Sequence, residues 1–272
     1  MVLLNRIINK IQNICCKYKW LKDAETERRM IGLHDIQTSI KNGKKLILLP
    51  HVDDEWIGCS QVLLQSDDVT LCDMDMLGGD SIEIHQKRKL ELHRLSELLQ
   101  LPVITIGNNK INSLVEVIEE TKCEQIFVPF FVDWHKEHLE VIDLLKSALK
   151  ETEREILVVA YQVSLPLSEQ NINVALPMSK AIWKKKWKIF KKIYPSQLHI
   201  PYKRFSLHEK INGAYVGAYA AEVFCVMDKG TWLKASSDYK ISPAERECFL
   251  SNLNDISKVR EAIRSYHINH NL

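Results

Sequence analysis

Two polar stretches of the sequence contain the residue types that bind metal ions, and each follows an apolar stretch. The apolar segment LILLP (46–50) leads into HVDDE (51–55), which has one histidine and three carboxylates in five positions. The apolar segment QIFVPF (125–130) leads into FVDWHKEH (131–138), which has two histidines and two carboxylates. Burying such charges without partners would cost several kcal/mol for each group. HVDDE is therefore expected to be either a solvated loop or part of a cation site.

The segments around these stretches alternate between strand-like and helix-like patterns. Short apolar runs typical of buried strands occur at 46–50, 69–74, 103–107, 125–130 and 155–161. Between them, apolar residues recur three and four positions apart, as in helices, at 56–65, 81–100, 111–122 and 138–152. This alternation predicts an α/β fold, a Rossmann-like three-layer α/β/α sandwich with a mostly parallel sheet.

The predicted fold brings the two polar stretches together. Parallel strands place their carboxyl ends at one edge of the sheet, where open α/β sheets bind ligands. HVDDE and DWHKEH both lie at such ends, so we expect them to form one site. Two histidines and a carboxylate with an open position are typical of catalytic zinc sites. The same ligands also occur in non-haem iron oxygenases, but the common fold of those enzymes is antiparallel, unlike the pattern predicted here.

Several motifs resemble those of the PIG-L/LmbE-like zinc N-deacetylases, which remove acetyl groups from N-acetylglucosamine-type sugars. HVDDE resembles that family's H-P-D-D-E motif, and HKEH (135–138) resembles its H-x-D-H motif. Arg88 and Glu91, Ser196-Gln197 and the segment AYAAEVF (218–224) are similar to further family positions. The resemblance runs from about residue 44 to 225 and leaves residues 1–40 outside it.

The resemblance implies a role for each polar residue. It implies that His51, Asp54 and His138 bind Zn²⁺, with another divalent metal left open. It also implies that Asp53 is the general base and that His135, in protonated form, polarises the substrate or stabilises the oxyanion. The expected reaction is hydrolysis of the acetamide of an N-acetylated amino sugar, on a glycan, a lipid-linked sugar or a glycoside.

Two positions depart from the family motifs. Val52 stands in place of the proline of the first motif, and Glu137 in place of the aspartate of the second. Glu137 would orient a histidine or the base, and Asp133 is a candidate to share that task. Asp80 and Arg88 are expected to hold sugar hydroxyls or a phosphate of the substrate.

Composition and charge limit the remaining interpretations. The 37 basic and 35 acidic residues nearly cancel, which does not favour a nucleic-acid-binding protein. The seven cysteines form no CxxC pair, which favours a reducing compartment and mostly buried thiols. We expect two regions, an amphipathic helical extension over 1–43 and a single α/β deacetylase domain over 44–272. The segment 162–180 is expected to be loop-like.

Two predicted basic helices are compatible with a second function. One is predicted near the N-terminus, with apolar residues at helical spacing over 4–15, and the other at 181–194, where aromatic residues form a stripe opposite a row of lysines. They allow a cytoplasmic protein with a peripheral contact at the inner face of the membrane, and a substrate that is phosphorylated or lipid-linked. The alternative to an enzyme is a catalytically weak or inactive relative that binds sugars or membrane surfaces. The oligomeric state is not predicted.

Overall fold

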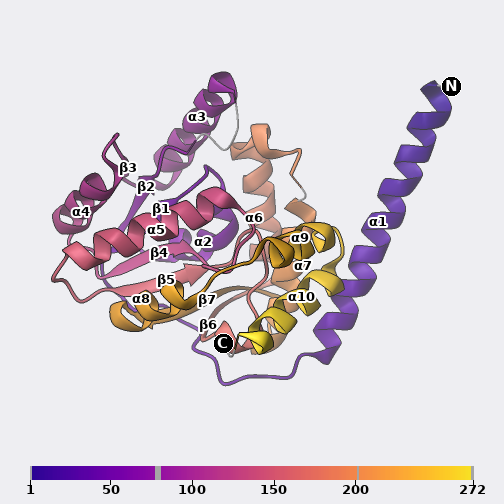
Figure 1. Cartoon of the computed structure of the whole chain (residues 1–272). Helices are drawn as coiled ribbons and strands as arrows, with labels where there is room; N and C mark the ends of the chain where they lie inside the picture. Colours follow the sequence, from indigo (N-terminus) through magenta and orange to yellow (C-terminus); the bar gives the residue numbers. More distant parts are fainter. Residues whose placement is uncertain (1, 77–80, 201, 271–272) are drawn as a thin grey trace.

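The computed structural model describes residues 2–76, 81–200 and 202–270, with the side chains of 2–14 and 16 excepted. Within this part of the chain, seven strands form one sheet in the order β3-β2-β1-β4-β5-β7-β6 (Figure 1). The strands are β1 (Lys45–Leu49), β2 (Val69–Asp73), β3 (Val103–Thr105), β4 (Gln125–Pro129), β5 (Leu157–Tyr161), β6 (Val174–Met178) and β7 (Ala220–Asp228). The first five strands are parallel, and β7 runs antiparallel to both β5 and β6. The predicted α/β fold with a mostly parallel sheet is confirmed.

Helices cover both faces of the sheet. The helices are α1 (Val2–Met30), α2 (Asp54–Gln65), α3 (Ile82–Leu99), α4 (Lys110–Thr121), α5 (Lys136–Glu151), α6 (Lys180–Ile193), α7 (Tyr202–Asn212), α8 (Lys229–Asp238), α9 (Pro243–Asn252) and α10 (Ile256–Asn269). Alternate residues of a strand point to opposite faces. Leu46 and Leu48 of β1 accordingly pack in a core with α4, α5 and α10, whereas Ile47 and Leu49 pack in a second core with α2, α3 and α6. These two cores give the predicted three layers.

The four helices and five strands predicted between residues 46 and 161 are all present. The prediction for 162–180 was wrong in part, because this segment contains strand β6 with Pro177 inside it. β6 is the last strand of the sheet, and an edge strand tolerates a proline because one of its sides needs no ladder hydrogen bond. The composition of the segment is typical of a loop, and a strand can form there because it lies at the edge of the sheet.

Helix α2, which begins at the first polar stretch, packs unusually close to the sheet. A Cβ atom at Gly58 would lie 2.4 Å from the Tyr161 ring, so only glycine fits at this point of α2. The Tyr161 hydroxyl in turn donates a hydrogen bond to the carbonyl of Leu48 at 2.8 Å. This close contact fixes the start of α2 relative to the ends of β1 and β5.

The N-terminal helix α1 is held at its C-terminal half. Arg28 donates hydrogen bonds to the carbonyls of Ala218 at 2.6 Å and Tyr219 at 3.0 Å, and Glu27 pairs with Arg264 at 2.7 Å. The N-terminal half extends away from the body of the molecule (Figure 1). The apolar stripe predicted over 4–15 falls on side chains that, Cys15 apart, lie outside the described set, and Cys15 is exposed.

Two further features are the state of the thiols and the apolar character of the helices. The six cysteines whose side chains are described are all unpaired, and four of them, Cys59, Cys72, Cys123 and Cys225, are buried. Among the described residues, no helix has the length and apolar character needed to cross a membrane.

Candidate active site

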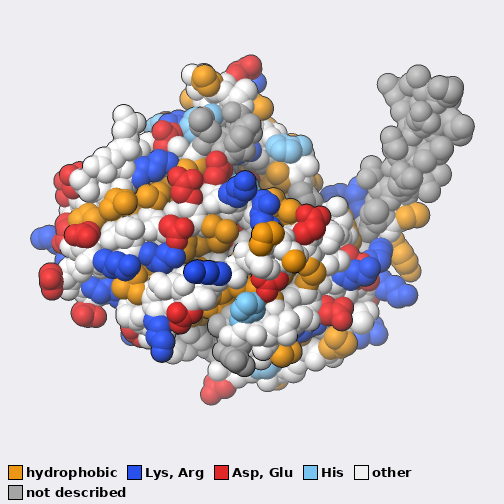
Figure 2. All heavy atoms as spheres, viewed as in Figure 1, with side chains coloured by type: hydrophobic (Ala, Val, Ile, Leu, Met, Phe, Trp, Pro, Cys, Tyr) orange, Lys and Arg blue, Asp and Glu red, His pale blue; other side chains and the backbone are white. Residues whose placement is uncertain are grey.

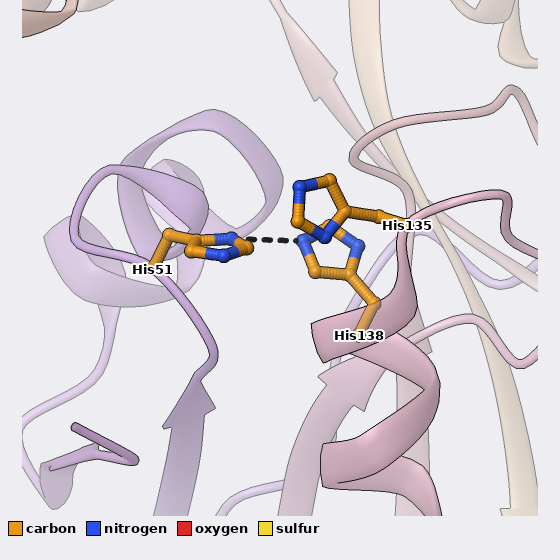
Figure 3. A group of neighbouring side chains, drawn as sticks. All are labelled: His51, His135 and His138. Carbon is orange, nitrogen blue, oxygen red and sulfur yellow. Dashed lines mark hydrogen bonds between the residues drawn. The ribbon is translucent and has the colours of Figure 1, made fainter. Parts of the chain in front are cut away.

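The two polar stretches meet at the carboxyl edge of the sheet, as expected. Strands β1 and β4 are neighbours, and HVDDE follows β1 whereas DWHKEH follows β4. His51 lies in the loop between β1 and α2, Asp54 is the first residue of α2, and His135 and His138 lie at the start of α5. In Figure 3 the three histidine rings lie close together, His51 coming from the loop after β1 and His135 and His138 from the start of α5.

Three donor atoms from the two stretches form a small triangle. His51 Nδ1 lies 3.2 Å from His138 Nε2, and Asp54 Oδ2 lies 3.4 Å from each of these nitrogens. A tetrahedral zinc with bonds of about 2.0–2.1 Å requires its ligand atoms to be about 3.3–3.4 Å apart. The triangle therefore has the size of one face of a tetrahedral metal site.

His135 adds a further nitrogen to this group. Ligand atoms of His51, His135 and His138 all lie within 4.8 Å of one another. The ring of His135 stacks on that of His138, with centroids 4.8 Å apart. A set of three histidines is therefore a second candidate ligand set, beside the set of two histidines and Asp54.

Carboxylates contact the nitrogens of His51 and His138 that lie outside the triangle. Asp133 Oδ2 lies 2.8 Å from His138 Nδ1, and its other oxygen accepts a hydrogen bond from the backbone of His135 at 2.9 Å. Glu137 contacts His51 Nε2 through one carboxylate oxygen. Such carboxylate–histidine pairs fix the orientation of an imidazole and leave its second nitrogen to face a metal. Asp133 and Glu137 thus lie where the sequence predicted orienting residues.

Asp53 has a backbone conformation that separates it from Asp54. It has φ +122°, a left-handed value that is rare and strained for a residue other than glycine. Its backbone N–H donates to the Glu55 carboxylate at 3.0 Å. The Asp54 carboxylate contacts the two histidines, while both aspartates line one pocket. A strained residue at a pocket wall is typical of a functional position.

The two triangle histidines hold their protons strongly. Burial opposes protonation of His51, but its hydrogen bonds with Asp54 and Glu137 outweigh burial and raise its pKa to about 9. His138 is buried as well, and Asp133 and Asp54 together raise its pKa to about 10. Burial would raise the pKa of Asp54, but His138 and His51 hold it well below its ordinary value. The centre of the triangle therefore favours positive charge.

The pKa values of Asp53 and His135 shift in the opposite directions to those of Asp54 and the two triangle histidines. Burial, with Asp54 and Glu55 close by, raises the pKa of Asp53 well above its ordinary value. Burial together with the charges of His138 and His51 lowers the pKa of His135 to about 4. His135 is therefore neutral near pH 7, which corrects the protonated form expected from the sequence. A neutral imidazole still has an N–H to donate, so the correction concerns its charge.

A pocket of about 400 Å³ opens over these residues. Of the predicted residues, His51, Asp53, Asp54, Arg88, His135 and His138 line it. Asp133 and Glu137 lie behind the histidines, and Asp80 lies outside the described residues. Arg88 donates to the Gln197 side chain at 3.2 Å, and Glu91 accepts hydrogen bonds from Ser196. The family-like positions on α3 and after α6 thus contact one another beside the pocket.

Several other residues of the pocket wall had no role predicted from the sequence. Gln197 stood in a family-like motif, and Trp134 lies within DWHKEH, so a signal existed for both. Arg204 and Phe205 on α7, and Leu250, Leu253 and Asn254 near α9, had none. These late segments carry no motif, and only their packing over the sheet edge brings them to the pocket.

Comparisons with known proteins agree with this fold. No protein-family model matches the chain, and no curated protein matches its sequence. Among solved structures, N,N'-diacetylchitobiose deacetylase from Pyrococcus horikoshii superposes with a TM-score of 0.59 at 15% identity, over 77% of this chain and 90% of that one. The conserved protein TT1542 from Thermus thermophilus gives a TM-score of 0.55 at 19% identity, over 67% and 93% of the two chains. The A40926 pseudoaglycone deacetylase Dbv21 gives 0.51 at 14% identity, over 69% and 98%. The chain therefore shares its fold with these solved structures, and residues of HVDDE and HKEH, together with Arg88 and Gln197, line one pocket of that fold.

Proposed function

We propose that this chain is a metal-dependent N-deacetylase that hydrolyses the acetamide of an N-acetylated amino sugar to a free amine and acetate. The observation that carries the proposal is the triangle of His51 Nδ1, His138 Nε2 and Asp54 Oδ2, with sides of 3.2, 3.4 and 3.4 Å. The fold shared with solved deacetylases supports the reaction class.

The triangle fits Zn²⁺ better than harder cations. Two nitrogens and one oxygen suit zinc, whereas calcium and magnesium prefer oxygen ligands alone. His51, His138 and Asp54 would hold the ion, and another divalent transition metal with similar preferences would also fit. Bound there, the cation would supply Lewis acidity toward a water molecule and the amide carbonyl.

The residues around the triangle supply the proton transfers. Asp53 lines the pocket beside Asp54, and we assign it as the base that takes a proton from the attacking water. As the new C–O bond forms and the C–N bond breaks, Asp53 returns this proton to the leaving nitrogen.

His135 is assigned to the carbonyl oxygen of the substrate. Its ring lines the pocket beside the two triangle histidines. A neutral imidazole can donate an N–H hydrogen bond to the oxygen as negative charge develops there. Asp133 and Glu137 act through His138 and His51, whose orientation they hold.

The pocket wall favours a substrate that carries a negative charge. Arg88 and Arg204 both line the pocket, and burial lowers the pKa of Arg204 only to about 10, so its side chain stays cationic near pH 7. A guanidinium binds phosphate oxygens well. We therefore propose a phosphorylated or lipid-diphosphate-linked N-acetyl sugar as the substrate form.

The first test measures bound metal per chain by elemental mass spectrometry. We expect about one zinc in the wild type and a large loss in His138→Ala. His135→Ala is the matched control, because it removes a neighbouring histidine outside the proposed ligand set. Metal retained in His135→Ala and lost in Asp54→Asn selects the set with Asp54, and the reverse selects the three histidines. No specific metal in the wild type would refute the mechanism.

The second test measures acetate release from phosphorylated N-acetyl sugars and from the same sugars without phosphate. We expect faster turnover of the phosphorylated forms, and Arg204→Gln should remove that preference. Equal turnover of both forms by the wild type would refute the anionic substrate and leave the deacetylase itself intact. Metal binding without release of acetate from any acetylated sugar would favour the inactive, sugar-binding alternative.

A further inference from the structure

A second groove, of about 380 Å³, lies between helices α1, α6 and α7. Among the described residues, none lines both this groove and the active-site pocket. Helix α7 separates the two, since Arg204 and Phe205 line the pocket whereas Lys203, Ser206 and Leu207 line the groove. We call this second cavity the basic groove.

The basic groove concentrates positive charge. Six lysines line it, Lys17, Lys184, Lys188, Lys191, Lys203 and Lys210, and none of its described lining residues is acidic. The whole chain has a net charge of only +2, so these cations are a local feature rather than a consequence of composition. Such a cavity attracts an anion.

The tryptophans of the basic groove offer only their apolar ring surfaces. The indole N–H of Trp20 donates to the carbonyl of Asn254 at 2.7 Å, and that of Trp183 donates to the carbonyl of Ser206 at 3.2 Å. The indole N–H of Trp187 donates to Glu209 at 2.7 Å. All three tryptophans of the groove therefore have their polar atoms occupied by the protein.

The basic groove offers few groups that read a sugar or a base. Within the described part of its wall, Ser206 alone has a neutral aliphatic hydroxyl or amide, and this hydroxyl donates to the carbonyl of Lys203 at 2.7 Å. Recognition of a hydroxylated or heterocyclic ligand needs both donors and acceptors at fixed positions. Lysines supply donors only, so the groove suits a ligand with an anionic head and an apolar body.

We propose that the basic groove binds an amphiphile made of a phosphate head group and an aliphatic chain. The lysines of α6 and α7 hold the phosphate, and the chain lies against Trp20, Leu21 and Trp183. Lys210 Nζ already lies 4.6 Å from the Trp183 ring, so charge and ring surface adjoin within the groove. This site is independent of the proposed deacetylase reaction.

The test is calorimetric titration of the full chain with dodecyl phosphate below its micelle concentration. We expect saturable binding of one molecule per chain. Lys188→Gln/Lys191→Gln should weaken it by about tenfold or more, since a basic residue near a phosphate contributes roughly fivefold in affinity. The matched control is Lys185→Gln/Lys192→Gln, which removes two lysines of the same helix that do not line the groove. Leu21→Ser, at a residue that is 52% exposed, tests the apolar part without disturbing the core.

Three outcomes would overturn the proposal. Equal weakening by both lysine pairs would indicate nonspecific attraction. Inorganic phosphate binding as tightly as dodecyl phosphate would indicate a simple anion site. Binding only to vesicles that contain phosphatidic acid, and never to the monomeric amphiphile, would indicate a membrane-facing surface instead of a groove. His138→Ala should bind dodecyl phosphate like the wild type, so failure here and failure of the deacetylase proposal are separable.

Discussion

Helix α2 contributes to two clusters of buried charged side chains, and they differ in how their charges are paired. In the site cluster, Asp54 faces His51 and His138 in a triangle that lines a pocket. In the second cluster, which we call the closed ion cluster, Lys186 lies between Glu209 and Glu222 and donates to the carbonyl of Ile57 of α2. Asp54 and His138 are buried, as are Lys186, Glu209 and Glu222, in contrast to the Lys, Arg, Asp and Glu side chains scattered over the face shown in Figure 2. Burial alone therefore does not identify a functional site.

The closed ion cluster contains its own cation and satisfies its polar atoms internally. Glu222 also accepts hydrogen bonds from the Ser60 hydroxyl and from the backbone of Gln61 at 2.8 Å, and Glu209 accepts one from Trp187. In the site cluster, by contrast, two imidazole nitrogens face each other at 3.2 Å across a carboxylate. Such donors converge on a point that suits a cation from outside the protein. Convergence of possible ligand atoms, rather than charge or burial, therefore distinguishes the candidate site from the closed ion cluster.

The largest expected effect is the loss of bound metal and of activity when a residue of the triangle is removed. His51→Ala removes one corner of the triangle, so bound metal should fall from about one per chain to near zero. Deacetylation should fall by about 10⁴-fold or more, because the Lewis acid is lost. Elemental mass spectrometry and an acetate-release assay measure the two effects. Activity that survives loss of the metal would contradict the assignment.

A second variant separates proton transfer from metal binding. Asp53→Asn keeps the shape of the side chain but removes its ability to accept a proton, so turnover should fall by about 10²- to 10⁴-fold. Metal content should remain near that of the wild type, because Asp53 lies outside the triangle. If metal is lost together with activity, Asp53 is a ligand and the assignment of the two aspartates must be exchanged.

A substitution in the closed ion cluster should lower the stability of the protein and leave its metal content unchanged. Lys186→Met leaves Glu209 and Glu222 buried without their cation, which should cost about 3–5 kcal/mol in the free energy of unfolding. Urea denaturation measures this cost. Lys185→Met, at the exposed neighbouring residue of α6, is the matched control and should change stability by less than about 0.5 kcal/mol. Folded Lys186→Met that lacks metal would show that the two clusters are coupled.

The smallest expected effect concerns the carboxylate behind His51. Glu137→Ala removes the contact that orients this ring, so metal affinity should fall by about 10- to 100-fold. Glu137→Gln retains a hydrogen-bond acceptor and should lose less. Competition with a chromogenic chelator measures both affinities. Equal affinity in wild type and Glu137→Ala would mean that the Glu137 contact has no part in holding the ion.

The sequence by itself determined the layered α/β architecture and indicated which two polar stretches meet at the carboxyl edge of the sheet. Apolar periodicity is a local property, so the strands and helices between 46 and 161 could be predicted from their own residues. Because parallel strands place their carboxyl ends at one edge of the sheet, HVDDE and DWHKEH could also be predicted to lie close together. Asp133 and Glu137, predicted as orienting residues, both lie in the second of these stretches.

Only the tertiary structure decided the features that depend on contacts between distant segments. It showed that Lys186, one of several lysines in α6, is buried between Glu209 and Glu222, because charge in a sequence does not reveal which face of a helix packs. It placed β6 at the sheet edge, where Pro177 is tolerated. It brought Arg204 and the residues near α9 to the pocket wall, and it lowered the pKa of His135 through burial beside two other histidines. Burial and proximity are properties of the packed chain, and no local pattern of residues specifies them.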